Sequence, residues 1–329
     1  MKVVQFSAFG PPHEVAECVE VPDPGPPGPD EVVVEVEAFP INPADLLTIS
    51  GGYATRPPLP ATPGAEGVGR VVAAGADVDH VGLGDRVLLL CRENWVQRRT
   101  CKANEVLKLP GDGDALQFAM LKVNPATAWL MLTGYVELRP GDWVIQDAAN
   151  SGVGTNLIRL ARAEGWKTVN VVRRPELVDT LRERGADVVV VDGPDLAERV
   201  RAETGAAGIR LGIDAVAGEV TLRLVDCLAD GGTLVNYGML TGRPCMVSPS
   251  DLVFRSITLT GFWLAKELRR MSYDRIATLY ADLVRRMLDG QLWVEVEATY
   301  PIEEIKAALE HAGRGGRGGK ILVTPDGAI

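Results

Sequence analysis

The sequence predicts an α/β protein in which a domain with a parallel sheet is inserted into a β-rich domain. Residues 1–122 carry mainly strand patterns, residues 123–265 alternate strands with helices, and residues 266–329 return to the first domain. Repeated strand-helix-strand order favours a parallel sheet with helices on both faces and ligands at the carboxyl ends of the strands. We therefore expect a nucleotide domain over 123–265 and a second domain from 1–122 and 266–329.

The composition is that of an ordinary globular protein. The chain has 329 residues, 46% of them hydrophobic and 24% charged, with a net charge of −10. This acidity argues against nucleic acid or an anionic membrane as a partner, and no stretch resembles a membrane span. The short Gly/Arg run at 313–319 does not change that expectation. Five cysteines without C-x-x-C spacing indicate reduced thiols, so we expect a cytoplasmic protein.

The first third of the chain is predicted to be all β. Apolar residues alternate with glutamates between Val32 and Ala38, which is the pattern of a half-buried strand. Residues 67–74 and 86–90 are further strand candidates, and the chain starts with a strand-like MKVVQF. A region rich in proline and glycine, Pro22–Pro29, precedes the first long strand.

A strand, a turn of small residues, a helix and a second strand follow one another between Gly141 and Arg174. The strands are predicted at 143–145 and 169–172, and the turn runs from Ala148 to Gly154. Such a unit places a dinucleotide pyrophosphate on the N-terminus of the helix, where small residues allow a close approach. The motif is weak alone, because Ala149, Ser151 and Gly154 fill the positions of G-x-G-x-x-G.

The end of the second strand of this unit indicates which nucleotide is bound. A site for NADH usually has a carboxylate there to bind the ribose hydroxyls, whereas this chain has Arg173 and Arg174. Guanidinium groups suit a 2′-phosphate through paired, charge-assisted hydrogen bonds. The residues therefore predict NADPH as the cofactor.

The rest of the chain continues the same alternation and then returns to the first domain. A helix is predicted at 273–290, where apolar residues recur at helical spacing, and a last strand at 320–324. The other predicted strands are 188–191, 209–216, 233–237, 258–262 and 293–298, and the other predicted helices are 175–184, 219–229 and 302–311.

Several ordered segments resemble the medium-chain dehydrogenase/reductase superfamily. They are INPADLLTISGGY (41–53), PGAEGVGRV (63–71), VNPATAWLML (123–132), GDWVIQDAANSGVG (141–154), NVVRRPE (170–176) and ITLTGFWL (257–264). Within the superfamily the chain is most similar to the zinc-independent 2-enoyl thioester reductases, including the mitochondrial trans-2-enoyl-CoA reductases. The resemblance implies a Rossmann-type nucleotide domain inserted into a GroES-like catalytic domain.

The residues of zinc-dependent relatives are missing from the matching segments. Zinc alcohol dehydrogenases have a cysteine where this chain has Asn42-Pro43-Ala44-Asp45, and a His–Glu pair where it has Ala65-Glu66. A catalytic zinc ion needs about three protein ligands, usually with thiolate or imidazole donors. We therefore expect no metal, and we expect hydrogen-bond donors to polarise the substrate.

The resemblance makes Tyr53 the proton donor. Hydride attack on the β-carbon of an α,β-unsaturated thioester moves negative charge to the thioester oxygen and the α-carbon. A phenol stays protonated near neutral pH and can donate to such an enolate. Without the resemblance, a tyrosine that packs on the nearby Pro57 and Pro58 would be the simpler interpretation.

Other site residues carry over by the same matching. Asn124 and Trp263 join Tyr53 as the expected catalytic set, and Asn124 also suits the N-cap of a helix. Phe262, Trp263 and Leu264 are expected to wall the nicotinamide and acyl pocket, although aromatic residues at a strand end are often core. Lys320 is expected to bind the cofactor phosphates, unless it is a solvated lysine. The other expected cofactor residues are Asn150, Ser151, Gly152, Val153 and Gly154 at the pyrophosphate, and Tyr237, Gly238, Met239 and Leu240 at the nicotinamide.

Our leading hypothesis is an NADPH-dependent reductase of enoyl thioesters, carried by CoA or by a carrier protein, that acts as a homodimer. Two departures from the mitochondrial members bear on the details. The segment at Arg173-Arg174-Pro175 is one residue shorter, and the segment Leu88–Trp95 is shorter and more polar, which favours a short or polar acyl group. An NADPH-dependent quinone or enone reductase is the enzymatic alternative, and a catalytically silent nucleotide-binding protein is the non-enzymatic one.

Overall fold

The computed structural model describes residues 1–327 and divides the chain into two compact units. The first unit comprises Met1–Val123, Tyr273–Leu288 and the chain from Trp293 onward. The second unit comprises Asn124–Ser272 and Asp289–Leu292. The limits expected from the sequence were 1–122 with 266–329 and 123–265, and residues 328–329 lie outside the described part.

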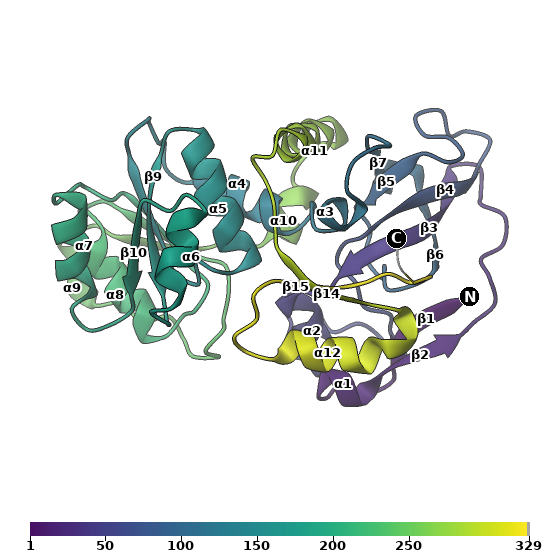
Figure 1. The fold of residues 1–329 in the computed structure, drawn as a ribbon, viewed down its shortest axis with the longest axis horizontal. Coiled ribbons are helices and arrows are strands. Elements are labelled where there is room, and N and C mark those ends of the chain that lie inside the picture. The colour runs from purple at the N-terminus through teal and green to yellow at the C-terminus, as the bar shows by residue number, and fades with distance from the viewer. Residues whose placement is uncertain (328–329) are drawn as a thin grey trace. The chain divides into compact units, whose positions relative to one another are not determined.

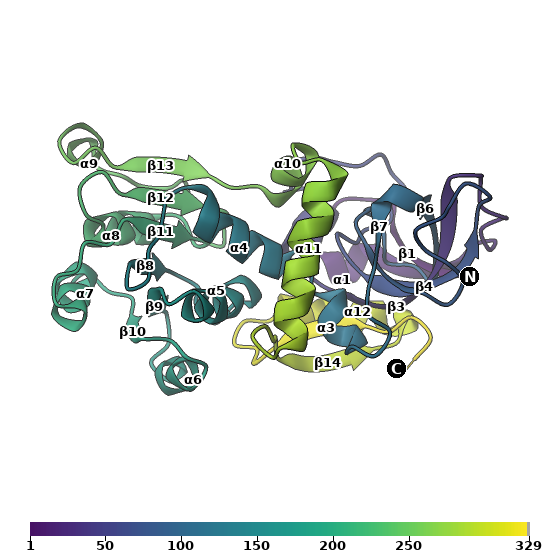
Figure 2. The ribbon, with the colours of Figure 1, turned by 90° about the horizontal axis from the view of Figure 1, so that it is seen from above.

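The second unit is built on the parallel sheet that the strand-helix alternation predicts. Its six strands lie in the order β10-β9-β8-β11-β12-β13, and every neighbouring pair is parallel (Figure 2). Helices connect most successive strands (Figure 1). The strands are β8 (Trp143–Gln146), β9 (Lys167–Val172), β10 (Val188–Val191), β11 (Leu211–Asp214), β12 (Thr233–Asn236) and β13 (Thr258–Gly261). The helices are α4 (Asn124–Gly134), α5 (Gly152–Ala163), α6 (Leu177–Glu183), α7 (Leu196–Thr204), α8 (Glu219–Cys227), α9 (Pro249–Val253) and α10 (Leu264–Arg269).

The two faces of this sheet are buried under different helices. Val169 and Val171 of β9 share a core cluster with Val200 of α7 and Leu224 of α8. Val172, which points to the opposite face, packs in a second cluster that includes residues of α5 and α6. Alternate residues of one strand thus enter different cores, as the two-residue period of a strand requires. Such double coverage explains why these strands are nearly continuous apolar runs.

The first unit contains a mainly antiparallel sheet with the path β14-β15-β3-β4-β5-β7, and β6 also pairs with β3. The strands β1 and β2 form a separate antiparallel pair. The strands are β1 (Lys2–Phe6), β2 (Ala16–Glu20), β3 (Glu31–Pro40), β4 (Val68–Ala74), β5 (Arg86–Leu89), β6 (Arg98–Lys102), β7 (Val106–Lys108), β14 (Val296–Tyr300) and β15 (Lys320–Val323). The helices are α1 (Pro12–Val15), α2 (Pro43–Ser50), α3 (Ala115–Ala119), α11 (Tyr273–Leu288) and α12 (Ile305–Gly313).

The prediction that the first third is all β was wrong, because α1, α2 and α3 lie there. Helix α2 has local signals that explain it. Pro43 occupies the first turn, the Asp45 carboxylate accepts the backbone N–H of Asn42 at 3.0 Å, and Gly51 ends the helix with a φ of 79°. A residue such as Asn before a proline, an acidic residue three positions on and a closing glycine are start and stop signals of a helix.

The strand expected at 293–298 begins later than predicted, at Val296. The side chain of Gln117 explains the shift, because it donates to the carbonyl of Val294 at 2.9 Å and accepts the N–H of Val294 at 3.0 Å. A buried glutamine thus satisfies the backbone groups that a neighbouring strand would otherwise pair.

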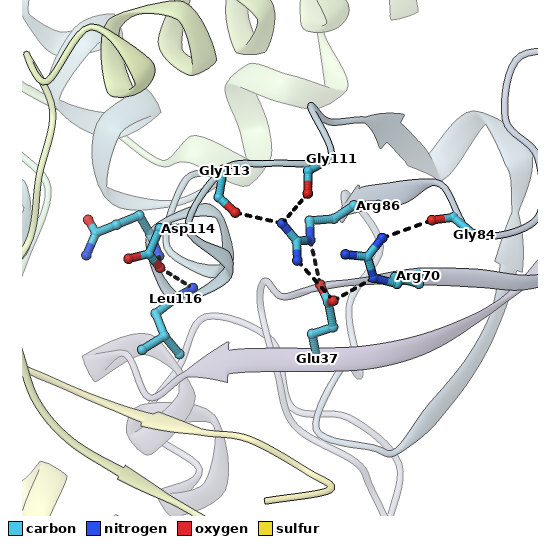
Figure 3. Close-up of polar contacts among 9 residues, drawn as sticks. Glu37, Arg70, Gly84, Arg86, Gly111, Gly113, Asp114 and Leu116 are labelled. Atoms are coloured by element: carbon cyan, nitrogen blue, oxygen red, sulfur yellow. Dashed lines mark hydrogen bonds and ion pairs between the residues drawn. The ribbon is translucent and has the colours of Figure 1, made fainter. Parts of the chain in front are cut away.

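A partly buried ion network ties three strands of the first unit together (Figure 3). The carboxylate of Glu37 on β3 accepts from Arg70 of β4 at 2.8 Å and from Arg86 of β5 at 2.7 Å. Arg86 also donates to the carbonyls of Gly111 and Gly113, at 3.1 and 2.6 Å, just before α3. The Arg86 guanidinium therefore fixes the segment that leads from the sheet into α3.

Candidate active site

A turn between β8 and α5 in the second unit forms a candidate cradle for phosphate. The Ser151 hydroxyl accepts the backbone N–H of Gly154 at 3.1 Å and caps α5. A Cβ at Gly154 would lie 2.6 Å from the carbonyl oxygen of Ala149, so only glycine fits there. Ala148, although not a glycine, has a φ of 43°, a strained conformation that is often found at functional sites. The free N–H groups and positive end of α5 suit an anion.

Asn124, the first residue of α4, lies against this cradle. Its side chain is 5% exposed, and its Nδ2 has no hydrogen-bond partner within residues 1–327. A Cβ at Gly152 would lie 3.0 Å from that Nδ2. A buried amide donor without a partner costs free energy unless a ligand satisfies it. The unsatisfied amide of Asn124 and its close approach to Gly152 therefore both suit a dinucleotide bound at this turn.

Two buried aspartates, Asp147 and Asp214, lie at the carboxyl ends of the adjacent strands β8 and β11. The register pairs Gln146 with Ile213, so Asp147 and Asp214 are the next residues of the two strands. Burial and the proximity of Asp214 raise the pKa of the Asp147 carboxyl well above its usual range. Sequence reasoning did not select either residue. An aspartate at the carboxyl end of each of two largely apolar strands was the signal that could have found them.

The carboxyl end of β12 lies beside that of β11, at the same edge of the parallel sheet. A Cβ at Gly238 would lie 2.5 Å from the carbonyl oxygen of Ala215, so a glycine is needed where these two strand ends approach. Burial and the neighbouring Asp147 raise the pKa of Tyr237, which lies within hydrogen-bonding reach of Ser151. Met239 and Leu240 are 55% and 61% exposed. Exposed apolar side chains at a ligand-binding edge suit an aromatic ring such as nicotinamide.

The arginine pair expected to select the nucleotide follows β9 directly. Arg173 is exposed and makes no hydrogen bond or ion pair with any residue in the described part of the chain. Arg174 is half-buried, and its Nε lies 3.7 Å from a carboxylate oxygen of Glu176. β9 and β8 are neighbours in the sheet, so both guanidinium groups follow the strand beside the cradle.

The residues after β13 divide into core and surface. Phe262 is 8% exposed and belongs to the interior of the second unit, and its expected place in the pocket wall stays a prediction. Trp263 is half-buried, and the guanidinium of Arg269 lies 5.0 Å from its ring centre. Leu264 begins α10 and is also half-buried. The expected catalytic role of Trp263 stays a prediction.

Tyr53, in the first unit, follows helix α2. Its backbone N–H donates to Leu47 at 3.1 Å, and the side chain is half-buried. The guanidinium of Arg92 lies 5.7 Å from the centre of its ring, so the ring stacks beneath a cation rather than only against prolines. Sequence reasoning did not select Arg92, although it lies in the polar segment 88–95.

The loop that carries Arg92 is anchored on both sides. The Asn94 amide donates to the carbonyl of Cys91 at 2.9 Å, and the ammonium of Lys122 donates to the same carbonyl at 2.9 Å. Trp95 is fully buried and stacks on Phe39 with 5.5 Å between ring centres. The backbone at Arg92 is therefore held in place while its side chain is exposed.

A buried cluster of charged and polar groups lies behind this segment of the first unit. Glu66 is fully buried and accepts from the Asn42 amide at 2.7 Å and from the N–H of Val123 at 2.7 Å. The ammonium of Lys320 donates to the Asn42 side-chain oxygen, and that of Lys122 donates to the carbonyl of Ala65. Lys320 is thus buried and paired with Asn42 rather than solvated. Its expected contact with the cofactor phosphates stays a prediction.

Burial shifts the titration of this cluster. Desolvation raises the pKa of Glu66 to about 7 and lowers the pKa values of Lys122 and Lys320 to about 8. The pKa of Asp45, which accepts the N–H of Ala65 at 3.0 Å, is also raised by burial. Opposite charges in the cluster compensate part of the cost of burying each group.

The raised pKa of Glu66 predicts a pH-dependent stability. The ordinary pKa of a glutamate is 4.5, so between 4.5 and about 7 the folded protein binds more protons at Glu66 than the unfolded chain. The contribution is complete below pH 4.5 and is lost as pH rises through about 7. We expect Glu66→Gln to flatten the stability profile in this window. Urea unfolding midpoints of both proteins at about pH 5 and about pH 7.5 test this; parallel profiles would contradict it.

The comparisons with known proteins agree with this arrangement. Residues 28–126 match the alcohol dehydrogenase GroES-like domain family, and residues 152–282 match the zinc-binding dehydrogenase family. A rat protein named mitochondrial enoyl-acyl-carrier-protein reductase is 37% identical over 287 residues, covering 85% of this chain and 77% of the rat protein. The human protein of the same name is 36% identical over 293 residues, covering 85% and 77%.

The chain belongs to the enoyl-acyl-carrier-protein reductase family of the medium-chain dehydrogenases/reductases.

Solved structures support the fold of this family member. A quinone oxidoreductase of Pseudomonas syringae superposes with a TM-score of 0.89 at 28% identity, covering 98% of this chain and 99% of the other. The Etr1p/Etr2p 2-enoyl thioester reductase of Candida tropicalis gives 0.85 at 24% identity, with coverage of 98% and 99%. The predicted combination of a Rossmann-type domain with a GroES-like domain is confirmed.

The family name of residues 152–282 refers to zinc, but this reductase has no donor set that suits it. Within residues 1–327 no three His, Cys, Asp or Glu side chains are grouped closely enough to hold a metal ion. At the matching positions Asn42 and Glu66 bind each other, and Asn42 also binds Lys320. A cationic ammonium in that place opposes a divalent cation rather than coordinating it.

No helix in the described chain combines the length and apolar character needed to cross a bilayer.

Proposed function

We propose that this protein is an NADPH-dependent reductase that saturates the α,β double bond of an enoyl thioester. The observation that carries this proposal is the sequence identity of 37% to a reductase named for that substrate class, over most of both chains. Tyr53 and Asn124 are retained in their expected segments, and the cradle at Ser151 and Gly154 suits a dinucleotide. These features argue against a catalytically silent nucleotide-binding protein.

The residues divide the work between the two units. NADPH supplies the hydride when it is bound. The cradle at Ser151–Gly154 would hold the pyrophosphate, the Asn124 amide would gain the partner it lacks, and the arginines after β9 would bind the 2′-phosphate. Tyr53 donates its phenolic proton to the enolate that forms as the β-carbon is reduced. The segment at Arg92 borders this phenol, and its exposed cation favours a short or polar acyl group over a long alkyl chain.

The direct test is NADPH oxidation with crotonyl-CoA and with enoyl thioesters of graded length on CoA and on acyl carrier protein. We expect saturated acyl thioester as the product and a decline of kcat/KM for long alkyl chains. Tight NADPH binding without turnover of any enoyl thioester would contradict the proposal.

A quinone or enone reductase is the second candidate, and one observation favours it. The Pseudomonas syringae quinone oxidoreductase has a higher TM-score and a higher identity than the Candida thioester reductase. Rates on a quinone and on crotonyl-CoA, measured with the same preparation, separate the two functions. The better substrate by kcat/KM identifies the acceptor.

Removing the two arginines after β9 should change the nucleotide preference. We expect Arg173→Ala with Arg174→Ala to lower kcat/KM for NADPH by about 10-fold to 100-fold, because charge-assisted hydrogen bonds contribute about 1.5–3 kcal/mol. The value for NADH should change little. Arg182→Ala, an exposed arginine of the nearby α6, is the matched control. An equal loss with both nucleotides would remove these arginines from the selection of the 2′-phosphate.

We also propose a homodimer that continues the sheet of the second unit. β13 pairs with β12 on one side only in the described chain. The N–H groups of Thr258 and Phe262 bind β12, so those of Leu259 and Gly261 point to the open edge. Sedimentation equilibrium at micromolar concentration should give twice the chain mass of 35.2 kDa. A monomer would contradict this. The cytoplasmic location stays a prediction, and the relatives compared are named mitochondrial.

A further inference from the structure

The aspartate pair at the cradle has an uneven set of hydrogen bonds. Asp214 is fully buried and accepts three donors: the N–H groups of Val216 and Ala217 at 2.9 and 2.8 Å, and the hydroxyl of Thr221 at 2.7 Å. Asp147, 2% exposed, accepts the N–H of Ala215 at 2.7 Å through Oδ1. Its Oδ2 is buried and has no donor within residues 1–327.

Two facing carboxylates in a buried site cannot both stay ionised, because their repulsion adds to the cost of desolvation. Asp214 has three donors that stabilise a negative charge, whereas Oδ2 of Asp147 has none. A proton on that Oδ2 removes both difficulties. It turns an unsatisfied acceptor into a donor, and Asp214 is the residue beside it on the neighbouring strand.

The strongest influences on the pKa of Asp147 are burial, Asp214 on β11, and the backbone N–H groups of Ala215 and Val216. None of them is a basic side chain. The other titratable groups that sense Asp147 are Tyr237 after β12 and Cys245, both of whose pKa values are raised by burial and by the two aspartates. None of these groups is cationic, so none of them offsets a second negative charge.

Asp147 also lies in the turn that leads to the cradle, four residues before the capping Ser151. A dinucleotide brings negative phosphates to this turn, and an ionised Asp147 would repel them at short range in a poorly solvated place.

We propose that Asp147 is a positioning residue that works as a neutral acid: its protonated Oδ2 keeps the proton and donates a hydrogen bond to Asp214, which joins the ends of β8 and β11 and keeps one negative charge out of the phosphate cradle. This inference rests on the proposed dinucleotide function, and it adds the protonation state that binding requires. By linkage, bound NADPH holds the proton more firmly, and loss of the proton weakens NADPH binding.

The protonation state is tested first without any nucleotide. The infrared difference spectrum between the wild type and Asp147→Asn, at about pH 7, should contain the carbonyl band of a protonated carboxylic acid. Asp142→Asn, at a half-buried aspartate just before β8 that pairs with Arg210 at 2.7 Å, is the matched control and should change carboxylate bands only. A difference spectrum of Asp147→Asn that shows only carboxylate bands would overturn the inference.

The positioning role is tested by the affinity for NADPH as a function of pH. In the wild type we expect Kd to rise by about tenfold between about pH 7 and about pH 10, in one proton step. Asp147→Asn, whose amide can still donate to Asp214, should bind within about twofold of the wild type at pH 7 and lose this slope. Tyr237→Phe should keep the slope, which assigns it to the aspartate.

The outcomes separate the inference from the proposed function. NADPH binding with a slope that survives in Asp147→Asn, or with no slope in the wild type, overturns the inference alone. A protein that shows the acid band but binds no NADPH at any pH contradicts the proposed function, and the positioning role falls with it.

Discussion

Tyr53→Phe is expected to lower kcat for an enoyl thioester by about 100-fold or more, because general acid catalysis typically contributes about 10²–10⁴-fold. The substitution removes one hydroxyl and keeps the ring on which the Arg92 guanidinium lies. Binding of NADPH, which is assigned to the other unit, should not change. Steady-state NADPH oxidation and a separate titration of NADPH affinity measure the two effects.

The control for this variant is the affinity for NADPH, measured on the same preparation as the turnover. Full turnover in Tyr53→Phe would remove the phenol from the reaction. An equal fall in NADPH affinity and in kcat would indicate damage to the fold instead.

Glu66→Leu is expected to cost about 3–5 kcal/mol of the free energy of unfolding, because it removes one partner from a buried charged cluster. The change leaves the amide of Asn42 and the N–H of Val123 without an acceptor, in a fully buried place. It also removes a buried carboxylate that acts on the ammonium groups of Lys122 and Lys320, on which Asp45 acts as well. Urea unfolding at neutral pH measures the loss.

Two further variants show whether charge or shape is responsible. Glu66→Gln resembles the protonated carboxyl and keeps one acceptor, so it should cost only about 1–2 kcal/mol. Adding Lys320→Met to Glu66→Leu should restore part of the stability, since it removes a buried cation that has lost one of its opposite charges. If Glu66→Leu is as stable as the wild type, the cluster does not stabilise this unit.

Most of the second unit could be predicted from the sequence because its signals are local. The apolar run at β8, the small residues from Ala148 to Gly154 and the helical spacing in α5 lie in one continuous stretch. Strand β6 (Arg98–Lys102) was missed because its sequence, RRTCK, has little apolar character. It is a strand because it pairs with β3, and that contact is not visible along the chain.

The parts of the site that belong to a local sequence pattern were predictable. Arg173, Arg174 and the cradle follow directly from the strand-helix-strand pattern. The burial and hydrogen-bond partners of Lys122, Lys320 and Asp147 do not follow from it. Lysines and aspartates are usually exposed, so their burial depends on partners that are distant in sequence, such as Asn42 for Lys320. Composition and periodicity do not report such partners.

The division of the first unit across the chain constrains the order of events during synthesis. Strand β15 (Lys320–Val323) lies between β14 and β3, and Lys320 contacts Asn42 inside the core. A nascent chain on the ribosome can complete the sheet of the second unit once Gly261 has emerged. The sheet of the first unit can be completed only after β14 and β15 have been made. Until then the backbone groups of β3 that pair with β15 have no partner and can bind another chain. A chaperone that shields β3 would therefore raise the yield of soluble protein.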